Sequence, residues 1–165
     1  MRLMVLLALV PLSGCATAVL LPADSGSEFS PIDFFENSSR GVGTFHRVFA
    51  APARLEVAST GTRRPNGELV LTQRIRQGGD APRTRTWTIR PVGPNRYTGT
   101  LTEAVGPVHI TTDGPRASVH YAMKDGLTVR QQLALQSDGT LLNHLEVRKW
   151  GLRVARVNER IRKLP

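Results

Sequence analysis

The sequence contains one cysteine and no long apolar run beyond its start, and each shortage excludes a class of protein. A single cysteine among 165 residues excludes an internal disulfide and a cysteine-based zinc site. No apolar stretch of about 20 residues follows the first two dozen positions, which excludes several transmembrane helices. The Gly-x-Ser-x-Gly motif and nucleotide-type phosphate loops are also absent. The sequence therefore predicts no catalytic residues, no cofactor and a protein that is not an enzyme.

The remaining composition fits one globular domain with a strongly basic surface. Hydrophobic residues make up 40% and charged residues 21% of the chain, whose net charge is +9. Of the 22 basic residues, 19 are arginine. Three explanations are open: arginine-rich codons of a GC-rich genome, attraction to an anionic membrane surface, or nucleic-acid binding. We expect no nucleic acid as a partner, because the start of the chain indicates export.

The first residues resemble an export signal. Residues 1–14 hold one positive charge, Arg2, followed by a short apolar run, which predicts a signal peptide. They lead into Leu-Ser-Gly-Cys, which resembles the bacterial lipobox and makes Cys15 the predicted lipidation site. The alternative is an ordinary signal peptide that is cut after Ala16 or Ala18 and discards the cysteine.

Lipidation at Cys15 predicts a location and a domain layout. Ala16 rather than aspartate follows the cysteine, which indicates a protein of the bacterial cell envelope, anchored by lipid to the outer membrane and facing the periplasm. Residues 15–31 are predicted to form the lipidated N-terminus and a flexible tether with an r.m.s. reach of roughly 20 Å. Residues 32–165 form the single folded domain. Its first residues, including Phe34 and Phe35, are too apolar for a linker and are expected to pack as a plug or short helical turn.

The folded domain shows the period-two alternation of β-strands, bounded by turn residues. We predict an all-β fold, an antiparallel up-and-down meander that closes into a barrel of about 8–10 strands. The last segment also fits an amphipathic helix over 153–163, but we favour a strand. The predicted strands are Gly41–Ala50, Ala53–Thr60, Glu68–Gln77, Arg83–Val92, Arg96–Glu103, Val108–Thr112, Arg116–Lys124, Leu127–Leu135, Thr140–Lys149 and Leu152–Lys163.

Several short motifs in a fixed order resemble a known family. These are Phe34-Phe35 before a glycine, Arg85-Thr86-Trp87, Arg96-Tyr97-Thr98-Gly99, Leu141-Leu142-Asn143 and Trp150-Gly151-Leu152-Arg153-Val154. Together they resemble the DUF3833 family of bacterial lipoproteins over residues 32–163. The resemblance implies a calycin- or lipocalin-like barrel without an assigned activity. It also implies a connection with envelope lipid, because members sit in gene neighbourhoods for membrane fatty-acid modification.

Four residues are candidate ligand contacts inside the barrel. Arg85 and Trp87 lie two positions apart on one strand, so that their side chains share a face. Trp87, Tyr97 and Tyr121 would surround an apolar ligand, and Arg85 would hold its carboxylate or phosphate. The alternative is structural: the arginine stacks on an aromatic ring and the tyrosines pack in the core. No metal is predicted, since nothing completes a ligand set around His144 and Glu146.

Basic residues gather in the last two predicted strands. Arg148, Arg153, Arg156 and Arg160 are candidate docking residues for a membrane or a protein partner. At around 1 kcal/mol per basic residue near an anionic surface, such a stripe could orient a tethered domain. The alternative is an ordinary solvated face.

Two functions follow from these observations. The first is a lipid-anchored envelope protein that binds a hydrophobic ligand, a lipid or a fatty acid, without catalysis. The second is a structural or assembly lipoprotein with a filled barrel, whose basic face docks on envelope lipid or on a protein. A lined internal void would favour the first, and a packed interior the second.

Overall fold

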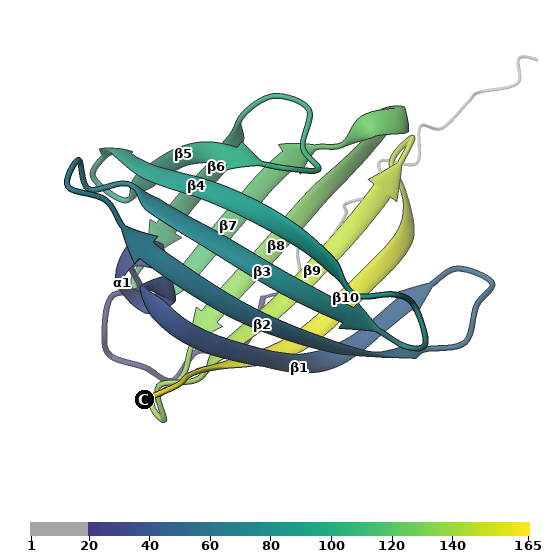
Figure 1. Cartoon of the computed structure of the whole chain (residues 1–165), viewed down its shortest axis with the longest axis horizontal. Helices are drawn as coiled ribbons and strands as arrows, with labels where there is room; N and C mark the ends of the chain where they lie inside the picture. The colour runs from purple at the N-terminus through teal and green to yellow at the C-terminus, as the bar shows by residue number, and fades with distance from the viewer. Residues whose placement is uncertain (1–19) are drawn as a thin grey trace, which may run out of the picture.

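The computed structural model describes residues 20–165, which form a closed barrel of ten antiparallel strands (Figure 1). Each strand pairs with the next along the chain, and β1 pairs with β10 to close the barrel. The predicted all-β meander barrel is therefore confirmed, and the last segment is a strand. The strands are β1 (Asn37–Arg47), β2 (Ala53–Arg63), β3 (Leu69–Gln77), β4 (Arg83–Gly93), β5 (Arg96–Leu101), β6 (Val108–Asp113), β7 (Arg116–Ala122), β8 (Leu127–Leu135), β9 (Leu141–Lys149) and β10 (Leu152–Lys163).

Alternation along each strand sends one set of side chains into the barrel. In β3, Leu69, Leu71 and Ile75 are buried, while Arg74 and Arg76 between and beside them are exposed. Residues that pair across neighbouring strands point to the same side of the sheet. Leu71, Trp87 and Leu101 pair in this way on β3, β4 and β5, and all three face the interior. One continuous apolar cluster therefore fills much of the interior.

A short helix closes one end of the barrel. Helix α1 (Pro31–Phe35) begins after Ser30, whose hydroxyl accepts a hydrogen bond from the Asp33 backbone N–H at 3.2 Å. Phe34 and Phe35 are buried against the barrel core, which confirms the predicted apolar turn. Gly61 makes this packing possible, because a Cβ at its position would lie 1.9 Å from the Phe35 carbonyl oxygen.

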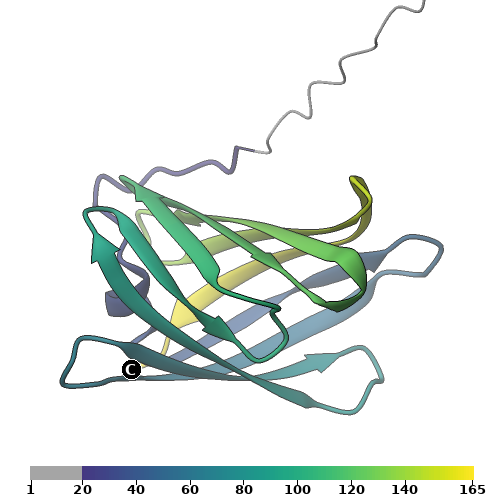
Figure 2. The same cartoon turned by 90° about the horizontal axis from the view of Figure 1, so that it is seen from above.

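Residues 21–29, which we call the N-terminal strap, are hydrogen-bonded to the outside of the barrel. The Asp24 carboxylate accepts hydrogen bonds from the backbone N–H and the hydroxyl of Ser137, at 2.8 and 3.0 Å. The Phe29 backbone N–H donates to the Gly114 carbonyl at 2.8 Å. Figure 2 shows this segment following the barrel before it reaches α1. In this part of the chain the structure differs from the free tether expected over 15–31.

A second helical turn, η1 (Lys124–Gly126), joins β7 to β8. Within residues 20–165, neither helix is long and apolar enough to cross a membrane. The predicted signal peptide and Cys15 lie outside the described residues, so lipidation stays a prediction.

Candidate functional site

The barrel interior contains two cavities on either side of a polar layer. The first, of about 40 Å³, lies next to α1 and is bordered by Phe35, Leu71 and Ile89. The second, of about 110 Å³, reaches the opposite ends of the strands, where Phe45, Gln77, Arg83, Met123 and Val147 line it. Arg85, Asn143 and Glu159 border both cavities. These three side chains therefore belong to the partition between them.

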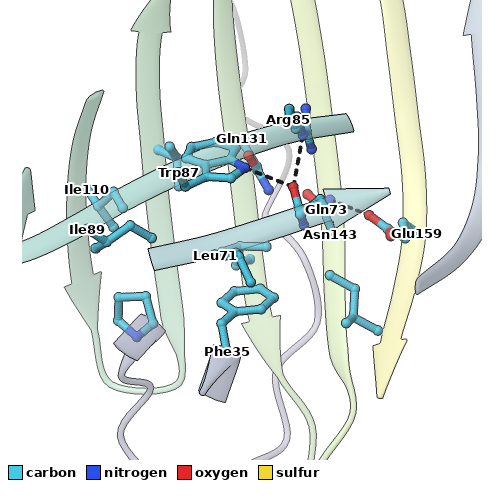
Figure 3. Close-up of a pocket in the computed structure, with 14 residues that line it drawn as sticks. Phe35, Leu71, Gln73, Arg85, Trp87, Ile89, Ile110, Gln131, Asn143 and Glu159 are labelled. Carbon is cyan, nitrogen blue, oxygen red and sulfur yellow. Dashed lines mark hydrogen bonds between the residues drawn. The ribbon is translucent and has the colours of Figure 1, made fainter. Parts of the chain in front are cut away.

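Gln73 organises one half of this polar layer. Its Oε1 accepts hydrogen bonds from Arg85 Nε and from Trp87 Nε1, both at 2.8 Å, and its Nε2 donates to the Ser59 hydroxyl at 3.1 Å (Figure 3). The Arg85 guanidinium lies 5.3 Å from the centre of the Trp87 ring, within the range of a cation–π contact. Arg85 Nη1 is also 3.7 Å from the Glu103 carboxylate. The arginine is thus held on three sides by the protein itself.

Glu159 and Asn143 form the other half of the polar layer. Asn143 Nδ2 donates to Glu159 Oε2 at 2.8 Å, and both side chains project from neighbouring strands into the interior (Figure 3). Gly41 makes room for the carboxyl group, since a Cβ there would lie 1.7 Å from Glu159 Oε1. Burial raises the pKa of Glu159 above its usual value, and the hydrogen bond from Asn143 and the charge of Arg85 only partly oppose this.

Two buried oxygen atoms in the layer have no hydrogen-bond partner among the described residues. They are the side-chain oxygens of Asn143 and Gln131, and both residues border the first cavity. Buried polar atoms in folded proteins are nearly always paired, so unpaired ones that face a cavity indicate a place for water or for a polar group of a ligand.

The structure brings together three of the four predicted ligand contacts. Trp87 borders the first cavity, Tyr121 the second, and Arg85 both. Trp87 and Tyr121 meet edge to face, with 5.7 Å between their ring centres. Tyr97 is also packed against the core, near the start of β5, but it borders neither cavity.

Comparison with known sequences identifies the family. The model of the family described as "Protein of unknown function (DUF3833)" matches residues 9–163. The chain belongs to this family. A comparison with curated proteins found no match.

Comparison with solved structures supports the barrel assignment for this DUF3833 protein. It is similar to the S-type phycobiliprotein lyase CPES from Guillardia theta, with a TM-score of 0.65 and 7% sequence identity, over 81% of this chain and 90% of that one. The likeness confirms the calycin-like fold, and at this identity it shows the fold alone.

The candidate docking residues of the DUF3833 protein lie on the outer face of β9 and β10, and most are engaged. Arg148 and Arg153 hold the two oxygens of Glu146, at 2.8 and 3.0 Å. Arg160 donates to the Thr140 hydroxyl at 2.8 Å. Arg156, half-buried, has no ion pair among the described residues. These pairs reduce the net positive charge of the face, and docking stays a prediction.

Sequence reasoning missed the polar half of the interior. Four polar residues occupy inward positions of the alternation, although the pattern of an antiparallel sheet predicts polar side chains on its outer face. They are Gln73, Gln131, Asn143 and Glu159. The signal was available in the register: Glu159 lies between the inward-facing Val157 and Ile161 of β10.

Proposed function

We propose that this DUF3833 protein is a lipid-anchored protein of the bacterial envelope that binds a small apolar molecule inside its barrel and does not transform it. The observation that carries the proposal is the polar layer: two unpaired buried oxygens and the half-buried carboxyl group of Glu159 border two internal cavities. Burying such groups costs free energy, and a purely structural barrel would gain stability from apolar residues at these positions.

The cavity sizes limit the ligand. Cavities of about 40 and 110 Å³ are smaller than the roughly 300–1,000 Å³ that hold drug-sized ligands. A short alkyl chain or a single ring suits the second cavity, and a longer chain would extend out of the end opposite α1. The residues around that end are mixed: Met123 and Val147 are apolar, while Arg83 and Glu103 are charged.

The small volumes of the two cavities also support the structural alternative, because much of the interior is filled by side chains. In that case the barrel would be a scaffold and its outer surface would carry the function. The two functions differ in whether a molecule leaves the purified protein on extraction with organic solvent.

The test uses the full chain and two matched variants. Val147→Phe adds a ring inside the second cavity, and Val42→Phe adds the same ring at an exposed position of β1. We expect the wild type and Val42→Phe to release one class of apolar molecule in near-equimolar amount, detected by mass spectrometry, and Val147→Phe to release less than a fifth of it. Equal or empty extracts from all three proteins would favour the scaffold.

A further inference from the structure

The polar layer contains two buried hydrogen-bond acceptors without a partner among the described residues. Gln73 Nε2, Asn143 Nδ2 and Trp87 Nε1 each donate one hydrogen bond to a protein oxygen. The side-chain oxygens of Asn143 and Gln131 accept nothing from the described residues. The Asn143 amide nitrogen faces the Glu159 carboxylate, so the other terminal atom of this side chain is the unpaired oxygen. A ligand group that pairs these two oxygens must therefore supply hydrogen-bond donors.

The two charged side chains of the polar layer, Arg85 and Glu159, also differ in whether they have a partner of opposite charge. Arg85 is stacked on Trp87 and lies 3.7 Å from Glu103, so its positive charge has an acidic neighbour. Glu159 has no basic group within ion-pair distance among residues 20–165, and Asn143 is its hydrogen-bond donor. A negative charge placed near Glu159 would disfavour its ionised form, whereas a positive charge placed there would favour and balance that form.

We propose, on the basis of the ligand-binding function above, that the ligand is an apolar molecule whose polar end donates hydrogen bonds, a protonated amine above all. The ammonium group lies between Glu159 and the Asn143 oxygen, and the apolar chain occupies the second cavity. This assignment differs from the acyl carboxylate on Arg85 that the sequence favours, because that arginine is already held by Gln73, Trp87 and Glu103.

Three probes with the same chain separate the possibilities: hexylamine, hexanol and hexanoate. The chain has two tryptophans, Trp87 in the lumen and the exposed Trp150. Titration of the full chain carrying Trp150→Phe therefore reports on the interior through Trp87 fluorescence. We expect hexylamine to bind at least tenfold more tightly than hexanoate, with hexanol between them.

Glu159→Gln should weaken hexylamine at least tenfold and change hexanol less than about twofold. The control is Glu56→Gln, which removes the same charge from the outer side of β2, where Glu56 pairs with Arg40 and Arg54. It should leave all three affinities unchanged. If Glu159→Gln does not fold, the ranking of the three probes on the parent protein still decides.

The outcomes distinguish this inference from the proposed function. Tightest binding of hexanoate, or equal affinity for the three probes, would overturn the amine assignment and leave a ligand-binding barrel. The assignment would also be overturned by an amine preference that survives Glu159→Gln. Binding of none of the probes, together with empty extracts from the wild type, would overturn the proposed function itself.

Discussion

At the scale of single residues, two carboxyl groups on neighbouring strands have opposite environments. Glu146, on the outer side of β9, is held by two arginines, while Glu159, on the inner side of β10, has an amide as its partner. Burial alone raises the pKa of a carboxyl group, and close guanidinium groups lower it. The two residues should therefore make the stability of the barrel depend on pH in opposite directions.

Glu146→Gln should destabilise the protein at neutral pH. Burial acts to raise the pKa of Glu146, but hydrogen bonds from Arg148 and Arg153 outweigh it and lower the pKa from 4.5 to about 2. Between pH 4.5 and 2 the unfolded chain therefore holds a proton on Glu146 that the native state lacks. The stabilisation from Glu146 is complete above about pH 4.5 and is lost as the pH falls towards 2. We expect the variant to lose about 2–3 kcal/mol at pH 7 and almost nothing at pH 2, measured by urea unfolding. Glu28→Gln, at an exposed position, should show no such loss.

Glu159→Gln should have the opposite effect. The pKa of Glu159 is raised by burial, so above the unfolded value of 4.5 the native state holds a proton that the unfolded state releases. Native stability from this group is therefore complete below pH 4.5 and decreases as the pH rises through its folded pKa. The variant, which cannot ionise, should match the wild type at pH 4 and be more stable at pH 8. A variant that is less stable than the wild type at pH 8 would contradict the inferred environment.

At the scale of elements, the number and order of the strands could be predicted, and most of their bounds closely, although β1 begins four residues before its predicted start; the interior could not be predicted. Alternation and turn residues placed the strand from Arg83 within one residue of its observed end, because both signals are local in sequence. The polar layer depends instead on which inward positions meet across ten strands, as Asn143 meets Glu159. The strap depends in the same way on distant residues: its hydrogen bonds join it to turns and strand ends far along the chain, and such pairing leaves no local pattern in the sequence.

The docking of α1 on β2 depends on a glycine. A methyl group at position 61 would overlap the Phe35 carbonyl oxygen, which is backbone and can move only with the helix. We expect Gly61→Ala to cost about 1–3 kcal/mol, as overpacked positions commonly do, and to speed amide exchange within α1. Gly26→Ala, where nothing lies within 4 Å of the added methyl group, is the matched control and should change neither quantity. Unchanged exchange in α1 after Gly61→Ala would show that the helix is not held in this way.

At the scale of the whole molecule, the strap fixes where an anchor could hold the barrel. From Cys15 to Leu21 the chain can span at most about 20 Å when fully extended. Leu21, Pro22 and Asp24 are hydrogen-bonded to the side of the barrel formed by the ends of β7, β8 and β9. A lipid on Cys15 would therefore keep this side of the barrel close to the membrane.

Cys15→Ser tests the anchor, and Asp24→Ala tests the strap. We expect the wild type and Asp24→Ala to sediment with membranes after cell lysis and Cys15→Ser to appear in the soluble fraction, because one residue carries the lipid and the other only positions the barrel. Asp24→Ala should instead speed proteolysis within residues 21–29, since it removes two hydrogen bonds to Ser137. Cys15→Ser that stays with membranes would disprove anchoring through this cysteine and would turn attention to the basic outer face of β9 and β10.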